Sequence, residues 1–135
     1  MLAVGCFAAV HAPQATTLFS AKKACLDNYT YASIGDRASA HLKQWGRFEL
    51  VSDPKAADVI FVLSLREVPG RVLESTGRGV RRTYIPIAGT TSMVVVDAKT
   101  RTILYSDARK WTHSTEAGKL IDALKKRMNK AQAVR

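Results

Sequence analysis

One short segment of the chain is rich in arginine and glycine, and it is the best candidate for specific binding. The run Arg-Gly-Val-Arg-Arg occupies residues 78–82, with Arg71 before it and Tyr84 after it. A guanidinium group offers a planar fork of donors that matches phosphates and carboxylates, and glycine lets the backbone approach a ligand. Tyr84 can stack on a base or a sugar. The candidate anion-binding or partner-binding residues are therefore Arg71, Arg78, Arg81, Arg82 and Tyr84; the alternative is a solvated basic loop.

The other reactive side chains form no recognisable catalytic or metal-binding pattern. Ser106, Asp107 and His113 are the ingredients of a nucleophilic triad, but no nucleophile-elbow glycines flank the serine. His11 and His41 lie far from His113, and no cluster of His, Cys, Asp and Glu has the spacing of metal ligands. Phosphate-binding and dinucleotide-binding glycine motifs are absent from the sequence. We therefore expect a protein that is not an enzyme and that uses no cofactor or metal.

Positive charge is in large excess and is unevenly distributed. The 135 residues include 21 Lys and Arg against 11 Asp and Glu, a formal net charge of +10. The excess lies in residues 66–82, 99–110 and 119–135, whereas residues 22–58 are nearly neutral. A field of this sign favours anionic partners and opposes self-association.

The first residues of the chain differ in composition from the rest. Residues 2–10 are apolar or small, and no Lys, Arg, Asp or Glu precedes Lys22. This run is too short to span a bilayer but suits the apolar part of a signal peptide. We expect an exported leader over residues 1–15, and Gly5-Cys6 suggests a second form of export, in which Cys6 is acylated. The alternative is an N-terminal strand packed in the core.

Apolar periodicity predicts an α/β (α+β) fold in a single domain. Residues 117–128 place apolar side chains at helical spacing, and the apolar run at 59–63 indicates a central strand covered on both faces. We expect a mixed sheet of about five strands with two main helices packed on one face. The expected helices are 33–45, capped by Ser33 with Asp36, and 116–130; the expected strands are 22–27, 48–51, 58–65, 93–96 and 102–106. The expected organisation is a linker at 16–21, the domain at 22–130 and a tail at 131–135.

Residues 66–90 contain several Gly and Pro and show little periodicity. A connection of this length is a functional loop, a disordered segment or an unrecognised hairpin, of which 80–87 could form a part. We treat it as a long basic loop. The periodic positions of the expected elements predict a buried set of Leu42, Trp45, Phe48, Val59, Phe61, Leu63, Val95, Ile103, Leu120, Ile121 and Leu124.

Two linked segments carry a resemblance to known proteins. The first contains Trp-Gly-Arg-Phe at 45–48 and Asp-Pro-x-x-Ala-Asp-x-Ile-x-Val-Leu at 53–63; the second contains Val-Val-Asp-x-Lys-Thr at 95–100 and Ser-Asp-x-Arg-Lys-Trp at 106–111. This pattern resembles a family of uncharacterised secreted or periplasmic bacterial domains. Their layout is similar to the N-terminal domain of the Tol-system translocation protein and to curli-secretion-type lipoproteins. The resemblance implies the fold, and because its motifs are structural it implies no catalytic residue.

Arg101 departs from that pattern. Related hairpins favour Gly at this position, where a left-handed backbone is needed. Arg101 therefore implies either backbone strain or a turn of another type.

These observations leave two hypotheses for function. The first is an exported, non-enzymatic domain, periplasmic or secreted, whose basic surface binds an envelope component such as an anionic lipid, a polysaccharide or a protein. The alternative is a nucleic-acid-binding module that uses the Arg-rich loop 66–82, although no RNA-binding or DNA-binding motif with its aromatic platform is present.

Overall fold

The computed structural model describes residues 18–74, 82–111 and 113–133, and along 68–74 and 82–88 it describes the backbone alone. The elements in chain order are β1 (Lys23–Asn28), α3 (Ala32–Trp45), β2 (Glu49–Leu50), the short 3-10 helix η1 (Pro54–Ala56), β3 (Val59–Glu74), β4 (Arg82–Asp97), β5 (Ile103–Lys110) and α4 (Ser114–Ala133). A helical turn at 18–20 precedes β1, and Leu18 and Ala21 are buried there, within the segment expected as a linker.

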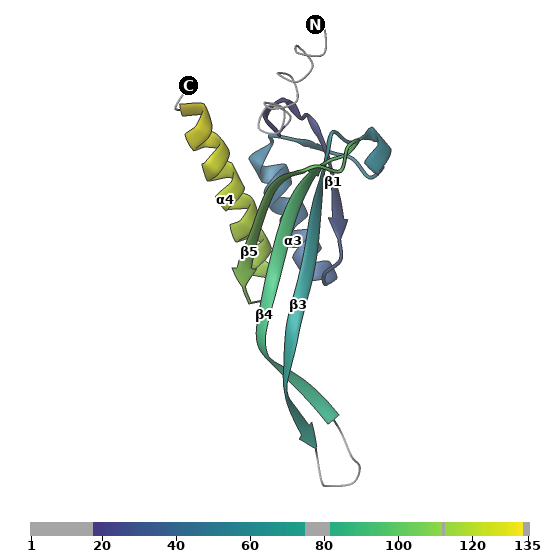
Figure 1. Ribbon diagram of the computed structural model, residues 1–135, viewed down its shortest axis with the longest axis vertical. Helices are drawn as coiled ribbons and strands as arrows, with labels where there is room; N and C mark the ends of the chain where they lie inside the picture. Colours follow the sequence, from purple (N-terminus) through teal and green to yellow (C-terminus); the bar gives the residue numbers. More distant parts are fainter. Residues whose placement is uncertain (1–17, 75–81, 112, 134–135) are drawn as a thin grey trace, which may run out of the picture.

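Five strands form one mixed sheet in the order β2-β1-β3-β4-β5. β1 lies parallel to β2 and to β3, while β3, β4 and β5 are antiparallel neighbours. The two main helices cover the same face: α3 contacts β1 and β2, α4 contacts β4 and β5, and the helices contact each other (Figure 1). The structure thus confirms the expected single α/β domain.

The core lies between the sheet and the two helices. Phe61 pairs with Val95 and Leu63 with Met93 across β3 and β4, and all of these side chains are fully buried. Burying one such side chain contributes about 1.5–3 kcal/mol, so this layer is a main source of stability. Of the predicted buried set, the structure confirms Leu42, Phe48, Val59, Phe61, Leu63, Val95, Leu120, Ile121 and Leu124.

Two predicted core residues are less buried than expected. Trp45 is only partly buried, with its ring edge-on to Phe48 at a centroid distance of 5.4 Å. Ile103 is 57% exposed. The reason is a β-bulge in β5: Tyr105 pairs with Val95 and Ile103 with Val96, so the residue between them is unpaired and Ile103 turns to the open face of the sheet.

Residues 66–90 are not simply a loop, and the hairpin alternative is the one that the structure supports. β3 continues to Glu74, β4 begins at Arg82, and the two strands remain paired throughout. The strand pattern was hidden because Pro69 and Pro86 interrupt it; these prolines pair with each other, and register shifts flank Pro69. Bulges of this kind accommodate a residue that has no N–H to donate to the ladder.

The ends of α3 show one expected and one unexpected feature. Gly46 ends the helix with a left-handed backbone, φ 72°. The predicted cap at Ser33 is wrong, because the helix begins one residue earlier at Ala32, and Tyr31 precedes it without a side-chain cap. The loop is instead held by the Asn28 side-chain amide, which donates to the carbonyl oxygen of Tyr31 at 3.2 Å.

Asp58, the last residue of the Asp-Pro-x-x-Ala-Asp segment, has a structural role. Its carboxylate Oδ2 accepts hydrogen bonds from the backbone N–H groups of Lys22 at 2.9 Å and Lys23 at 3.0 Å, at the start of β1. Its carbonyl oxygen accepts from Ala98 N at 3.0 Å, beyond the end of β4. The two backbone hydrogen bonds to the carboxylate hold the pKa of Asp58 below its ordinary value.

We expect Asp58→Asn to lower the free energy of unfolding by about 1 kcal/mol at pH 7, since one charge-assisted acceptor is lost at a largely exposed site. Because the folded-state pKa of Asp58 is depressed, its stabilisation is present above the unfolded value of about 3.9 and is lost as the pH falls through the folded value. Between pH 7 and pH 3, the free energy of unfolding measured with urea should therefore fall less for the variant than for wild type. Asp36→Asn is the matched control, since within the described part of the chain the Asp36 side chain forms no hydrogen bond or ion pair.

Arg101 adopts the left-handed backbone that the β4–β5 turn requires, with φ 63°. We expect Arg101→Gly to raise the free energy of unfolding by up to about 1 kcal/mol, because glycine adopts this conformation without a steric cost. Lys99→Gly is the control in the same turn and should lower stability instead. Thermal unfolding of both variants checks the sign, and a destabilised Arg101→Gly protein would contradict the expectation.

Candidate functional site

β3 and β4 extend together beyond the rest of the sheet. The pairing of β1 with β3 ends at Leu63. The pairing of β5 with β4 covers Thr91 to Val96 of β4 and does not reach the earlier part of that strand. Beyond these points β3 and β4 pair with each other from Arg66↔Thr90 to Glu74↔Arg82. Figure 1 shows the resulting two-stranded ribbon projecting from the body of the domain. We call its two strands, residues 66–74 and 82–90, the β-arm.

The β-arm carries part of the predicted site. Arg71, Arg82 and Tyr84 lie on its outer half, whereas Arg78 and Arg81 lie outside the described residues. The backbone partners across the arm are Ile85 for Arg71, Glu74 for Arg82 and Val72 for Tyr84. The predicted residues that the structure describes thus belong to one antiparallel ribbon rather than to an irregular loop.

The outer edges of the β-arm are open among the described strands. Between Val68 and Glu74, and between Arg82 and Ala88, no third described strand pairs with the arm. Open edges present rows of backbone donors and acceptors, and a two-stranded ribbon alone is marginally stable in water. Such a segment gains most when a partner covers it.

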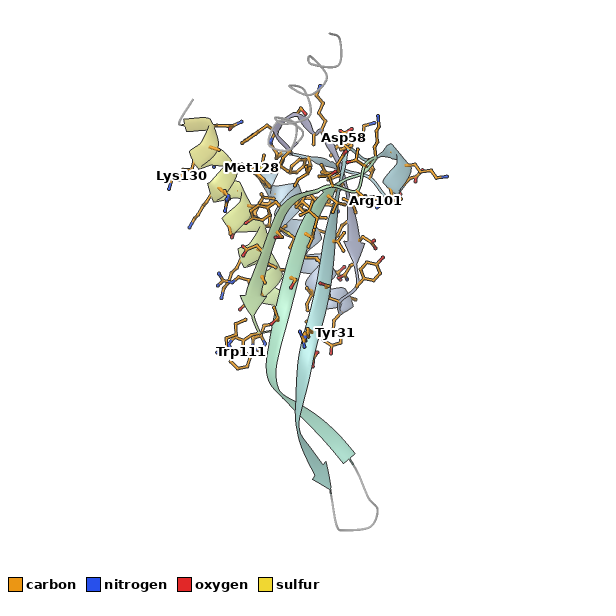
Figure 2. The ribbon with its side chains drawn as sticks, viewed as in Figure 1. Tyr31, Asp58, Arg101, Trp111, Met128 and Lys130 are labelled. Carbon is orange, nitrogen blue, oxygen red and sulfur yellow. The ribbon has the colours of Figure 1, made fainter. Side chains whose placement is uncertain are left out.

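The base of the β-arm is held from both sides, near Trp111 and near Tyr31 (Figure 2). Trp111 N donates to the carbonyl oxygen of Gly89 at 2.6 Å, and the buried Thr91 hydroxyl donates to the carbonyl oxygen of Trp111 at 2.8 Å. On the other side, the Tyr31 hydroxyl donates to a carboxylate oxygen of Glu67 at 2.5 Å, and this bond raises the pKa of Tyr31. The arm therefore leaves the body in a defined direction.

Trp111 combines backbone strain with exposure. Its φ is 83°, in the left-handed region that a bulky residue rarely adopts, and its side chain is 45% exposed. Lys110 Nζ lies 5.5 Å from the ring centre. The bonds to Gly89 and Thr91 keep the strained backbone in place and leave an aromatic ring with a cation beside the arm.

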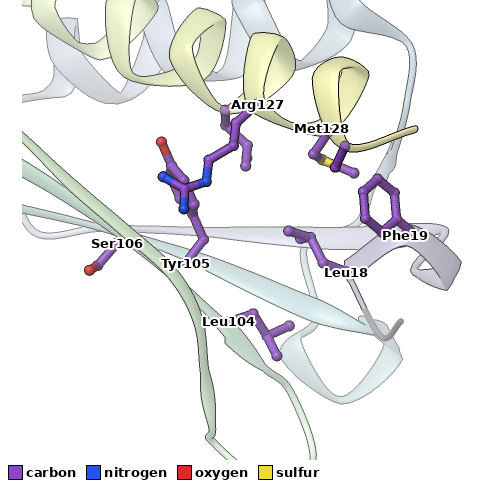
Figure 3. A pocket seen from close by; sticks show the side chains of 9 residues that line it. Leu18, Phe19, Leu104, Tyr105, Ser106, Arg127 and Met128 are labelled. Atoms are coloured by element: carbon purple, nitrogen blue, oxygen red, sulfur yellow. The ribbon is translucent and has the colours of Figure 1, made fainter. Parts of the chain in front are cut away.

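A second feature is a cleft near the C-terminal end of α4. This cleft, of about 440 Å³, opens between the C-terminal half of α4, the start of β5 and the helical turn at 18–20 (Figure 3). The Arg127 guanidinium carbon lies 5.9 Å from the ring centre of Tyr105 there. Burial first, and then the neighbouring Asp107 carboxylate, raise the pKa of the Tyr105 hydroxyl.

Sequence reasoning did not find this cleft, because its walls come from three distant segments. Helical periodicity predicts Leu124 to be buried, which the structure confirms, and Met128 on the same apolar face is also buried. The usable signal was the group Lys126, Arg127 and Lys130, which places cations around Met128 on the last turns of the helix.

Within residues 18–74, 82–111 and 113–133, no group of three or more His, Cys, Asp and Glu side chains is placed to hold a metal ion. Over the same residues, no hydrogen bond joins Ser106 or His113 to Asp107, which instead accepts from the Tyr105 hydroxyl at 3.3 Å. Cys25 is buried, and burial raises the pKa of its thiol. No described helix is both long enough and apolar enough to cross a membrane.

No protein-family model matches the sequence. No curated protein matches it either. Among solved structures, the chain is similar to PelC from Paraburkholderia phytofirmans, crystallised as a dodecamer, with 17% identity over 74% of this chain and 81% of that chain and a TM-score of 0.45. It is also similar to lipoprotein GNA1162 from Neisseria meningitidis, with 8% identity, 81% and 99% coverage and a TM-score of 0.42.

A third similar structure is a minor lipoprotein from Acinetobacter baumannii, with 12% identity, 82% and 92% coverage and a TM-score of 0.40. The likeness to bacterial lipoproteins concerns the arrangement of sheet and helices, and at these identities it transfers no residue role.

Proposed function

We propose that this chain is a non-enzymatic binding domain of the bacterial envelope, and that it holds an anionic partner through the β-arm. The observation that carries the proposal is the continuation of β3 and β4 as a ribbon with open outer edges. Among the side chains that the structure describes, the fully buried ones lie in the body, between the sheet and the two helices. The arm is therefore best explained by what it binds.

The charge of the segment indicates the kind of partner. Residues 66–82 carry five arginines and two glutamates. Arginine keeps its charge at any physiological pH and binds phosphates and carboxylates in a bidentate manner. Open backbone edges add donors and acceptors that an extended partner can use. An anionic surface of the envelope, such as phosphatidylglycerol head groups, supplies matching chemistry.

The envelope location rests on the composition of residues 2–10. This apolar run fits the central part of an export signal, and Cys6 within it offers a position for acylation. We propose a periplasmic or secreted location, with a lipid anchor at Cys6 as the second form.

One observation favours nucleic acid as a second candidate. A two-stranded β-ribbon is one of the shapes that fits the major groove of B-DNA, and the β-arm is a ribbon that carries arginines. Binding of this kind would use phosphate contacts and would weaken with salt.

The test of the proposed function compares two double variants that remove the same charge. Arg71→Gln with Arg82→Gln changes the β-arm, and Lys43→Gln with Lys55→Gln changes exposed positions of α3 and η1. In flotation with phosphatidylglycerol vesicles at low salt, we expect the arm variant to bind about thirtyfold more weakly than wild type, because each arginine near an anionic surface contributes about 1 kcal/mol.

The control variant should lose much less, and circular dichroism should show both variants folded. Equal losses in the two variants would contradict a role for the arm, since net charge alone would then explain binding. In parallel, a short DNA duplex is titrated at about 0.15 M salt. Tight binding to DNA that survives this salt concentration, together with weak binding to vesicles, would replace the envelope proposal by the nucleic-acid candidate.

A further inference from the structure

The cleft beside α4 has an apolar end and a cationic end. Leu18 and Met128 are buried in its walls, and Phe19 and Leu104 are partly buried beside them. Figure 3 shows Phe19 and Met128 at one end and Arg127 with Tyr105 at the other. A cleft of about 440 Å³, with walls that are apolar and polar in similar measure, falls within the size range of small-molecule sites.

The cations at this site are available to a ligand. Lys126, Arg127 and Lys130 follow one another along α4, and Arg127 lines the cleft. In the part of the chain that the structure describes, no carboxylate forms an ion pair with any of them. The nearby Asp107 is occupied by Tyr105 and by Ala108 N, which donates to it at 2.8 Å.

We propose that this cleft binds an amphiphile with a single acyl chain and an anionic head group. The chain lies against Leu18, Leu104 and Met128, where it removes apolar surface from water. The head group is bound by the Arg127 guanidinium, which can offer two parallel donors to a carboxylate or phosphate. Lys130, about one turn further along the helix, lines a neighbouring depression that shares Arg127 with the cleft, and it adds to the positive field around Arg127.

Charge complementarity selects this occupant over others. An uncharged apolar ligand would form no bond with the Arg127 guanidinium, and a hydrophilic anion would leave the apolar end in contact with water. A ligand with both parts satisfies both ends. The site is distinct from the β-arm, because Met128 and Lys130 are labelled at the end of the molecule opposite to the arm (Figure 2).

The test uses the full-length chain with ¹³C-methyl-labelled methionine and monomeric laurate. The Met128 methyl group reports on the cleft, and the Met93 methyl group, fully buried in the body, is the internal reference. We expect laurate to shift the Met128 signal saturably and to leave Met93 unchanged. Decanoate should bind about fifteenfold more weakly, since each methylene contributes about fourfold.

Three variants distinguish binding in the cleft from non-specific attraction to the positive charge of α4. Arg127→Gln should weaken laurate binding about tenfold through loss of a charge-assisted hydrogen bond. Lys125→Gln removes the same charge from the same helix outside this cleft and should leave the affinity within about twofold, as expected for an exposed charge. Ala131→Trp, at an exposed position on the rim, should block binding without disturbing the core.

The head group is distinguished by a parallel titration with lauroyl lysophosphatidylglycerol, and the charge by dodecyl maltoside below its micelle concentration. Saturable binding of laurate, of the lysophospholipid or of both supports the proposal and identifies a carboxylate or a phosphate ligand. An unmoved Met128 signal with both anions overturns it. Equal affinity for dodecyl maltoside, or equal losses in Arg127→Gln and Lys125→Gln, also overturns it. None of these results depends on whether the β-arm binds vesicles.

Discussion

The antiparallel ladder between β3 and β4 is the interaction on which the rest of the structure depends. The register that pairs Phe61 with Val95 and Leu63 with Met93 turns these side chains toward the helices. A slip of one residue would turn the same side chains to the open face and would remove the core. Because the same ladder continues, through the register shifts at Pro69, to Glu74 and Arg82, the packing of the body also sets the direction of the β-arm. Stability and the proposed binding surface are thus coupled through one set of backbone hydrogen bonds.

Helix α4 connects the two ends of the molecule. Near its start, the buried Glu116 accepts hydrogen bonds from Arg109 of β5 at 3.2 Å and from Lys119 at 3.4 Å. Burial alone would raise the pKa of Glu116, but these two bonds outweigh it and hold the pKa below its ordinary value. This end of the helix is neutralised within the protein, whereas the end at Arg127 and Lys130 is not neutralised by any described carboxylate. The anionic ligand proposed above binds at the end that has no such internal partner.

The fold could be predicted from periodicity where one face of an element is buried. The spacing of Leu120, Ile121 and Leu124 predicts α4. Arg101 indicates the strained position in the turn between β4 and β5. Prediction failed where a local irregularity changes the pattern: the bulge in β5 exposes Ile103, and paired prolines conceal the length of the hairpin. The arginines of the arm could be found from the sequence, because they are close neighbours in the chain. The cleft could not, because residues 18–19, 104–106 and 124–131 come together only in the folded protein.

The most direct test of the central claim is amide hydrogen exchange of the full-length protein with and without phosphatidylglycerol vesicles. Amides on the open edges of 68–74 and 82–88 have no described strand to protect them, so they should exchange rapidly in the free protein. The account predicts that vesicles slow exchange in both of these segments, while amides of β1 and of the paired part of β3 stay unchanged. Unchanged exchange along the β-arm at vesicle concentrations that bind the protein would contradict the claim that the arm forms the binding surface.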